Sequence, residues 1–337
     1  MKAIVCKEPN QFEMREAAMP EPKDGEVLLK MKRIGICGTD LHAYHGDQPY
    51  FTYPRRLGHE VSGEIVEIGA NDAGLKSGES VVIMPYLSCG TCIACRKGLT
   101  NACTSLSIIG VHQDGGMAEY ITMPESHLIK AEGLKEEQMA IVECLAIGAH
   151  ATRRANAQPG QKVLVIGAGP IGIGAMQFIR NAGAEVIAMD INEDRLAYCR
   201  DVIGVNHIVN GLENPTEQLG EITGGDFPDT VLEATGSPKS METAFQYVSH
   251  GGTYVLVSLV KADIAFSDPE FHKREMNLLS SRNATKEDLE HVVKAMQAGE
   301  VETEQFITHR AGFDEMIGVF DSWLDPANGV IKAVVEL

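Results

Sequence analysis

The first third of the chain alternates short apolar runs with glycine-containing turns. Within 27–34, Leu29 and Met31 alternate with lysines, which is the period-two pattern of a strand that buries one face. Similar patterns predict strands over 61–68 and 81–84. The glycines at positions 58, 63, 69, 74 and 78 interrupt this region. Short strands between frequent turns predict a compact, irregular β-barrel.

After about residue 148 the pattern becomes a regular alternation of strands and helices. Asn192 is suited to cap the helix that begins at residue 193. Alternation at this spacing predicts βαβ units, and therefore a doubly wound parallel sheet in an α/β protein. From about residue 285 an amphipathic helix over 286–298 and a closing strand over 330–336 are expected. In the alternating part, the predicted strands are 162–166, 185–189, 230–234 and 253–259, and the helices are 171–182 and 193–203.

Composition limits the partners that this chain can have. A length of 337 residues suits two domains, and 44% hydrophobic with 23% charged residues is typical of a globular protein. The net charge of −18 opposes binding to nucleic acid or to anionic membranes, so we expect a small-molecule partner. We find no apolar segment that could span a bilayer, and the charged N-terminus does not resemble a signal peptide. A cytoplasmic location is therefore expected.

Eight cysteines in a cytoplasmic protein indicate metal binding or catalysis before disulfides. Half of them follow a Cys-x2-Cys-x2-Cys-x7-Cys pattern on a loop that contains Gly90 and Gly98. Four thiolates at this spacing can surround one tetrahedral Zn²⁺, although an iron–sulfur cluster uses similar ligands. Because four protein ligands leave no open position, we expect this ion to be structural. The four ligands are Cys89, Cys92, Cys95 and Cys103.

A glycine-rich motif indicates a dinucleotide site. The sequence Gly167-Ala168-Gly169-Pro170-Ile171-Gly172 directly follows the strand predicted over 162–166 and opens a helix, which is the context that this motif requires. The glycines permit a tight turn, a close approach to a pyrophosphate and close packing of helix on strand. About 20 residues later, Asp190 is placed to accept hydrogen bonds from the adenosine ribose, which favours NAD over NADP. Arg195 either lies over the adenine or is a surface residue.

Four further residues have side chains that commonly bind metals. Cys37, His59, Glu60 and Glu143 are dispersed along the chain, and Glu143 lies inside an apolar stretch. A buried carboxylate needs a partner, and a metal ion is one possibility. From spacing alone, however, each residue has an ordinary alternative, such as a core thiol or a helix-terminal acid.

Taken together, these motifs resemble those of the zinc-dependent alcohol and polyol dehydrogenases of the medium-chain dehydrogenase/reductase superfamily. The resemblance covers essentially the whole chain. It implies a GroES-like β-barrel catalytic domain and a Rossmann domain. The expected limits are 1–147 for the catalytic domain, with a zinc lobe at 86–104, 148–281 for the NAD-binding domain, and 282–337 for the return to the catalytic domain. The segments that carry the resemblance are 35–40, 58–60, the four-cysteine lobe, 115–120 and the dinucleotide motif.

The resemblance also implies a role for each matching residue. Cys37, His59, Glu60 and Glu143 match the residues around a catalytic zinc, without showing which acid binds the ion directly. Asp40 matches the carboxylate that orients the zinc-binding histidine. Thr39 and His42 match a proton relay. We therefore expect two Zn²⁺ ions per chain, one catalytic and one structural, together with NAD. One departure is Cys144, where many polyol dehydrogenases have proline, and we expect it to be a core residue.

A closer resemblance is to the sugar-acid branch of the family, the L-galactonate and L-gulonate 5-dehydrogenases. It implies oxidation at carbon 5, giving D-tagaturonate or D-fructuronate. Basic residues would hold the substrate carboxylate, and Arg282 is the preferred candidate because it resembles a polyol-contacting position. The other candidates are Arg55, Arg56, Lys273 and Arg274. The segments that suggest this branch are 48–55, 109–116, 266–273 and 281–285.

Three alternatives stay open at this point. The substrate could instead be a neutral polyol or L-threonine. The chain could be a zinc-free reductase, although the presence of Cys37, His59 and Glu60 disfavours this. It could also be an NAD-binding protein without catalytic activity. The resemblance further implies a homodimer or a homotetramer.

Overall fold

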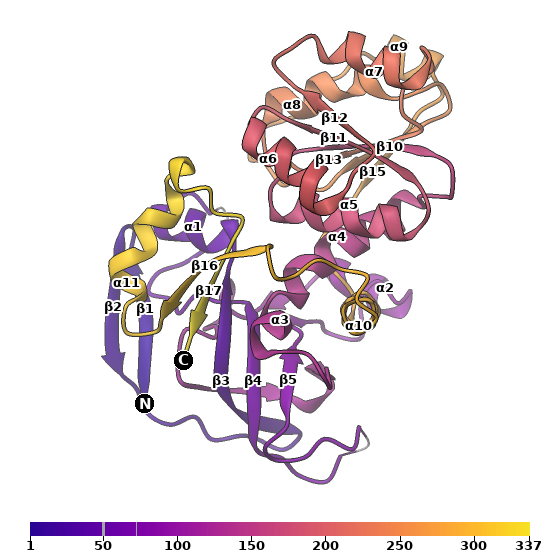
Figure 1. Cartoon of the computed structure of the whole chain (residues 1–337). Helices are drawn as coiled ribbons and strands as arrows, with labels where there is room; N and C mark the ends of the chain where they lie inside the picture. The colour runs from indigo at the N-terminus through magenta and orange to yellow at the C-terminus, as the bar shows by residue number, and fades with distance from the viewer. Residues whose placement is uncertain (49–50, 72) are drawn as a thin grey trace. The chain divides into compact units, whose positions relative to one another are not determined.

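The computed structural model describes residues 1–48, 51–71 and 73–337. The chain forms two compact units (Figure 1). The first unit contains both ends of the chain, whereas nearly all of the second is one continuous middle segment. The first comprises Met1–Cys144, Thr285–Gly299 and Thr303–Leu337, and the second comprises Leu145–Ala284 and Glu300–Glu302.

A seven-stranded mixed sheet organises the first unit. Its order is β16-β17-β3-β4-β5-β9, and β8 also pairs with β3. The long strand β3 is central: β17 and β8 pair with successive parts of it, and β4 pairs along much of its length. The bounds are β3 (Glu26–Ile36), β4 (Glu60–Glu67), β5 (Ser80–Ile83), β8 (Tyr120–Pro124), β9 (Leu128–Lys130), β16 (Ile307–Gly312) and β17 (Lys332–Glu336).

The three strands predicted in the first third of the chain are confirmed as β3, β4 and β5. Leu29 and Met31 are buried while Lys30 between them is exposed, as the alternation requires. Two further two-stranded sheets pair β1 with β2 and β6 with β7. The helix predicted over 286–298 is also confirmed, as α10. The remaining strands are β1 (Lys2–Glu8), β2 (Gln11–Glu16), β6 (Tyr86–Leu87) and β7 (Ser107–Ile108).

Short helices complete the first unit. The α-helices are α1 (Gly38–His45), α2 (Ile93–Arg96), α3 (Glu136–Ala140), α10 (Lys286–Gln297) and α11 (Met316–Val319). The 3₁₀ helices are η1 (Thr100–Ala102), η2 (Glu125–His127), η5 (Phe320–Leu324) and η6 (Pro326–Asn328). Helix α4 (Val142–Ala155) begins in the first unit and continues into the second.

The second unit is a six-stranded parallel sheet of order β12-β11-β10-β13-β14-β15. The chain builds outward from β10 in one direction and then resumes at β13 in the other, which is the doubly wound order with a switch point between β10 and β13. The strands are β10 (Lys162–Ile166), β11 (Glu185–Asp190), β12 (His207–Asn210), β13 (Thr230–Glu233), β14 (Thr253–Leu256) and β15 (Asn277–Ser280). The helices are α5 (Pro170–Asn181), α6 (Glu193–Tyr198), α7 (Pro215–Thr223), α8 (Pro238–Thr243) and α9 (Asp268–Lys273), with η3 (Cys199–Ile203) and η4 (Ala244–Tyr247).

The sequence predicted four of the six strands and two of the helices of this unit, but not β12, β15, α7, α8 or α9. Two of the predicted elements end earlier than expected. The strand predicted over 253–259 ends at Leu256, because β13 already ends at Glu233 and offers no strand beyond it; the N–H groups of Val257 and Ser258 donate to the Glu233 carbonyl instead. The helix predicted over 193–203 changes at Cys199 into a wider π-helical turn. Asn192 caps α6, since its side chain accepts a hydrogen bond from the Arg195 N–H at 3.1 Å.

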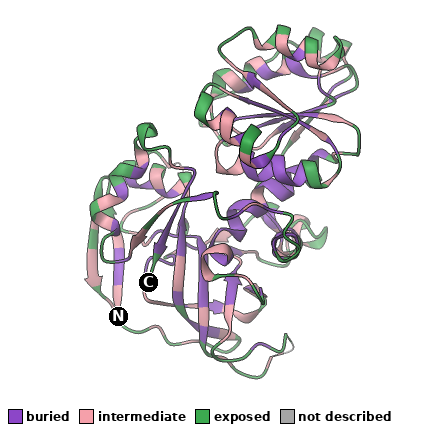
Figure 2. Ribbon diagram, viewed as in Figure 1, coloured by how far each residue is buried: buried purple, intermediate pink, exposed green. Residues whose placement is uncertain are grey.

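Burial is concentrated in the central strands of both sheets, as Figure 2 shows, whereas the edge strands β15 and β16 are mostly exposed or half-buried. Aliphatic side chains dominate each core, in agreement with the low aromatic content of 6%. Among the helices of the described residues, none has both the length and the apolar character needed to cross a membrane.

A buried ion pair joins two strands of the first unit. Lys332 at the start of β17 is 1% exposed, and Glu60 at the start of β4 is fully buried. The Lys332 ammonium donates to both Glu60 carboxylate oxygens, at 2.7 and 2.8 Å, and to the carbonyl of Ile36 at 3.1 Å. Burial alone would lower the pKa of Lys332, but Cys144, Glu60 and Cys37 around it raise that pKa above its usual value. The pair therefore ties β17 and β4 together across the end of β3.

We expect Lys332→Met to lower the free energy of unfolding by roughly 3–5 kcal/mol, because Glu60 would be left as an uncompensated buried charge. Urea denaturation of the purified protein measures this change. The double variant Lys332→Met/Glu60→Gln removes both charges and should recover much of the lost stability. A Lys332→Met protein as stable as the wild type would show that the pair does not secure the strand.

Candidate metal and cofactor sites

Three metal-ligand side chains converge where β3 ends and β4 begins. Cys37 directly follows β3, and His59 and Glu60 stand at the start of β4. One ligand atom from each residue lies within 4.8 Å of the others. Strand register accounts for part of this convergence, since Gly35 pairs with Glu60. Gly35 is also required here, because a Cβ at that position would lie 2.3 Å from Glu60 Oε2.

Asp40 in the first turn of α1 connects the two loops that carry these ligands. Its Oδ2 accepts the Cys37 N–H at 3.0 Å, and its Oδ1 accepts the Gly58 N–H at 3.2 Å. Oδ1 also faces His59 Nδ1 at 3.6 Å. This arrangement leaves His59 Nε2 for a metal, which is how a carboxylate orients a metal-binding imidazole.

The electrostatics of this group favour a cation. Burial by itself lowers the pKa of His59, but the facing Asp40 and Cys37 raise it well above its usual value. A thiolate, an imidazole and a carboxylate held within one small, mostly buried volume form a donor set suited to Zn²⁺. The residues present therefore fit a zinc ion.

Glu143 lies beside this group but is not one of the three clustered ligands. It stands in the first turn of α4, is 4% exposed, and accepts a hydrogen bond from the buried Tyr86 hydroxyl. Burial and the charge of Glu60 raise its pKa to about 7, against the opposing effects of His59 and Tyr86. The adjacent Cys144 is 1% exposed, and burial raises the pKa of its thiol well above the usual value. Cys144 is thus a core residue, as expected.

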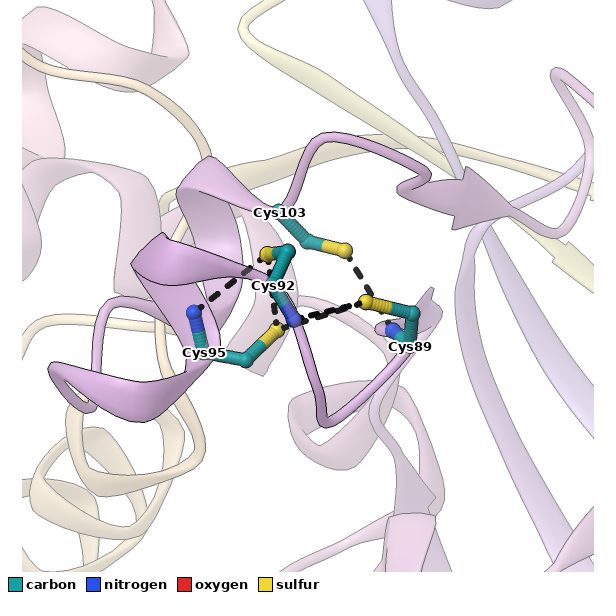
Figure 3. A group of neighbouring side chains, drawn as sticks. All are labelled: Cys89, Cys92, Cys95 and Cys103. Atoms are coloured by element: carbon teal, nitrogen blue, oxygen red, sulfur yellow. Dashed lines mark hydrogen bonds between the residues drawn. The ribbon is translucent and has the colours of Figure 1, made fainter.

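The four cysteines of the lobe form a second metal-ligand group (Figure 3). The Sγ atoms of Cys92 and Cys95 are 3.5 Å apart, and those of Cys89 and Cys95 are 4.0 Å apart. These separations exclude disulfides, and they match the roughly 3.8 Å edge of a tetrahedron with Zn–S bonds of about 2.3 Å. The Cys92 N–H donates to the Cys89 sulfur, and the Cys95 N–H donates to the Cys92 sulfur. Backbone hydrogen bonds, chiefly the one from Cys95, lower the pKa of Cys92 to about 5. The lobe therefore fits a structural zinc ion.

The dinucleotide motif lies at the carboxyl end of β10. Gly167 has a φ of 101°, which favours glycine. Gly172 packs so closely that a Cβ there would lie 1.8 Å from the Gly167 carbonyl oxygen, whereas a Cβ on Gly169 would meet no atom within 4 Å. Gly169 therefore leaves open backbone before α5, with Pro170 and Ile171 in its first turn. A helix N-terminus of this kind can receive a pyrophosphate.

Asp190 and Arg195 lie next to this loop. Asp190 ends β11, and its carboxylate accepts the N–H groups of Ala168 at 2.6 Å and of Asn192 at 2.9 Å. The Arg195 guanidinium donates to the Ala168 carbonyl at 3.1 Å, and burial lowers its pKa. Both residues therefore help to fix the backbone of the motif, and Arg195 is not merely a surface residue.

The proton-relay candidates lie on α1. Thr39 and the exposed His42 are three positions apart, and so lie on one side of that helix.

The basic candidates for the substrate carboxylate near β15 lie at opposite edges of the parallel sheet. Arg282 follows β15 at the carboxyl edge. Lys273 and Arg274 precede β15, at the opposite edge, and Arg274 donates to the carbonyls of Gln246 and Val248. Arg282 therefore stays the preferred candidate for the substrate carboxylate.

The other two basic candidates already face an acid. Arg55 and Arg56 lie 3.9 and 3.5 Å from Asp114, which offsets part of their charge. The segment 48–55, which suggested the sugar-acid branch, includes positions 49 and 50, which lie outside the described residues.

The candidate catalytic group consists of Cys37, His59, Glu60 and Glu143 with their buried neighbours Lys332 and Tyr86. Sequence reasoning missed the last two. Lys332 had a usable signal, because it is a lone cation in the apolar segment Val330-Ile331-Lys332-Ala333-Val334. A lysine within a buried strand requires a counter-charge. Tyr86 had no comparable signal, since its partner Glu143 is 57 positions away.

Comparisons with known proteins agree with this geometry. Residues 23–133 match the alcohol dehydrogenase GroES-like domain, and residues 170–298 match the zinc-binding dehydrogenase family. The chain is 41% identical to L-galactonate-5-dehydrogenase of Escherichia coli K12, over 99% of this chain and 98% of that protein. It is 32% identical to L-threonine 3-dehydrogenase of Bacillus licheniformis, over 94% and 93%.

Solved structures give the same result. The rspB alcohol dehydrogenase of Escherichia coli CFT073, crystallised with NADH, superposes with a TM-score of 0.92 at 29% identity and covers 100% of this chain and 99% of its own. The fold is thus a GroES-like domain with a Rossmann-type domain, and the activity is that of an oxidoreductase acting on CH–OH groups with zinc and a nicotinamide cofactor. The chain belongs to the zinc-binding alcohol dehydrogenase family.

Proposed function

We propose that this protein is an NAD-dependent dehydrogenase of a sugar acid. The reaction is oxidation of the carbon 5 hydroxyl, converting L-galactonate to D-tagaturonate or L-gulonate to D-fructuronate. The convergence of Cys37, His59 and Glu60 within 4.8 Å carries the proposal for the chemistry. The 41% identity to L-galactonate-5-dehydrogenase over nearly the full chain supports the substrate class.

Each residue of the catalytic group has a distinct task in this proposal. Cys37, His59 and Glu60 would hold the ion, and we assign Glu143 to bind it directly or through water. A zinc ion bound there supplies Lewis acidity, which makes a substrate hydroxyl easier to deprotonate. Asp40 keeps the His59 ring in place, and Lys332 holds the Glu60 carboxylate in position.

The proton released from the substrate hydroxyl needs a route to solvent. Thr39 stands in the first turn of α1, and the exposed His42 follows one turn later on the same side. We assign Thr39 to accept the proton and His42 to pass it to water, since imidazole exchanges protons readily near neutral pH.

The cofactor in this proposal is NAD. Gly167, Gly169, Pro170, Ile171 and Gly172 would hold its pyrophosphate, with the bound nicotinamide accepting hydride from carbon 5. Asp190 would accept hydrogen bonds from the adenosine ribose, and its charge would repel a 2′-phosphate. Arg195 supports this loop through the Ala168 carbonyl.

Further assignments follow for the partners of the protein. The formal charge of −18 and eight unpaired cysteines suit a cytoplasmic enzyme that does not bind nucleic acid or membranes. We assign a homodimer or homotetramer, because β15 is an edge strand of the described sheet and exposes Leu278.

L-threonine is the second candidate substrate, because the chain is 32% identical to an L-threonine 3-dehydrogenase. A panel of L-galactonate, L-gulonate, sorbitol and L-threonine, assayed with NAD by the absorbance of NADH, separates the candidates. We expect kcat/KM for one of the two aldonates to exceed that for sorbitol by about a hundredfold, since a charge-assisted hydrogen bond to the carboxylate contributes roughly 1.5–3 kcal/mol. Faster turnover of sorbitol or L-threonine would contradict the sugar-acid assignment.

Arg282→Gln should raise KM for the aldonate, whereas Lys273→Gln, at the opposite edge of the sheet, serves as the matched control and should not. Equal effects of the two substitutions would remove Arg282 from the proposal while leaving the substrate class in place.

Asp190→Ala should lower the preference for NAD over NADP by about a hundredfold, because it removes the ribose acceptor and the charge that repels a 2′-phosphate. The ratio of kcat/KM values for the two cofactors measures this. Glu193→Ala is the matched control, since Glu193 is an exposed acid three positions away. An unchanged ratio in Asp190→Ala would contradict the ribose role.

A further inference from the structure

A second buried acid, Glu233, lies where the two halves of the parallel sheet diverge. It ends β13, the strand that pairs with β10 across the switch point, and its side chain is fully buried. In doubly wound sheets the cofactor binds in the crevice outside the carboxyl ends of these two strands. Glu233 therefore lies directly below the expected cofactor crevice, although no motif in the sequence singled it out.

The Glu233 side chain fastens the turn that follows it. Its Oε1 accepts the Thr235 N–H at 3.1 Å and also the Thr235 hydroxyl. The Thr235 Oγ1 in turn accepts the Ser237 N–H at 3.0 Å. One carboxyl oxygen thus fixes the turn 234–237 through a single threonine.

That turn packs against the first glycine of the dinucleotide motif. A Cβ placed on Gly167 would lie 3.0 Å from the Ala234 carbonyl and 3.1 Å from Thr235 Cγ2. The Ala234 N–H donates to the Ile166 carbonyl at 2.8 Å, and the Gly167 N–H donates to the Met189 carbonyl at 2.8 Å. Gly167 is therefore confined between β11 on one side and the turn held by Glu233 on the other.

The other oxygen of the Glu233 carboxyl group is also shielded from water. Oε2 is buried, and no described residue donates a hydrogen bond to it. Burial raises the pKa of Glu233, and the hydrogen bonds from Thr235 partly offset this effect.

We propose that Glu233 is a positioning residue for the nicotinamide cofactor, holding the turn 234–237 against Gly167 so that the pyrophosphate loop keeps its binding geometry. The inference rests on the proposed NAD-dependent function. It adds a residue outside the glycine motif to the cofactor site.

The test compares NADH affinity, measured by fluorescence titration, across four variants of the full-length, zinc-replete protein. Glu233→Ala and Thr235→Val should each raise the Kd of NADH by about tenfold, with KM for NAD rising more than kcat falls. Glu233→Gln keeps an acceptor oxygen for Thr235 in a side chain of the same shape, and its Kd should stay within about twofold of the wild type. Thr230→Val is the control, because Thr230 is a buried threonine at the opposite end of the same strand.

The outcomes separate this inference from the proposed function. If the wild type binds NADH and both Glu233→Ala and Thr235→Val bind it equally well, the positioning role is overturned while the cofactor assignment stands. If the wild type does not bind NADH, the cofactor assignment itself fails. Should Glu233→Ala not fold, Thr235→Val carries the test alone, since it removes one hydroxyl and leaves the carboxyl group in place.

Discussion

The ion pair between Glu60 and Lys332 is the constraint on which the catalytic group depends. Lys332 stands at the start of β17, near the end of the chain, and Glu60 at the start of β4, and both are almost wholly buried. A carboxylate this far from water needs a permanent partner. Because the partner comes from the final strand, Glu60 has its counter-charge only when the chain has returned to the first unit. The pair also explains how the Glu60 carboxylate can be buried without a bound metal ion.

In the second unit, two acidic side chains fix neighbouring loops through hydrogen bonds. Its dinucleotide motif follows β10 at the switch point between β10 and β13. The loop after β10 and the loop after β13 are neighbours there, because these two strands pair directly. Backbone hydrogen bonds and two buried side chains fix this region: Asp190 fastens the loop after β10, and Glu233 fastens the loop after β13. The two acids differ in exposure. Asp190 is partly exposed and faces polar groups, whereas Glu233 is fully buried below the expected cofactor crevice.

Much of this organisation could be predicted from the sequence. The motif at 167–172 and the four cysteines carry their structural context in local spacing, so the parallel sheet and the lobe were predictable from short segments. Lys332 and Tyr86 could not be assigned in this way, because each acts through a partner far away in the sequence. The role of Glu233 could not be predicted for the same reason, and also because a glutamate at the end of a strand has many ordinary explanations. The end of β14 was missed because it depends on where the neighbouring strand stops.

The chain has two sets of zinc ligands of different chemistry, one of four thiolates and one of Cys37, His59 and a buried acid. Zinc K-edge X-ray absorption on a Cys103→Ser variant, which disables the structural site, distinguishes the two sets. We expect zinc to remain bound with a single sulfur neighbour among nitrogen and oxygen ligands. If this variant loses all its zinc, or if its remaining zinc is surrounded only by sulfur, the second set of ligands does not hold the ion.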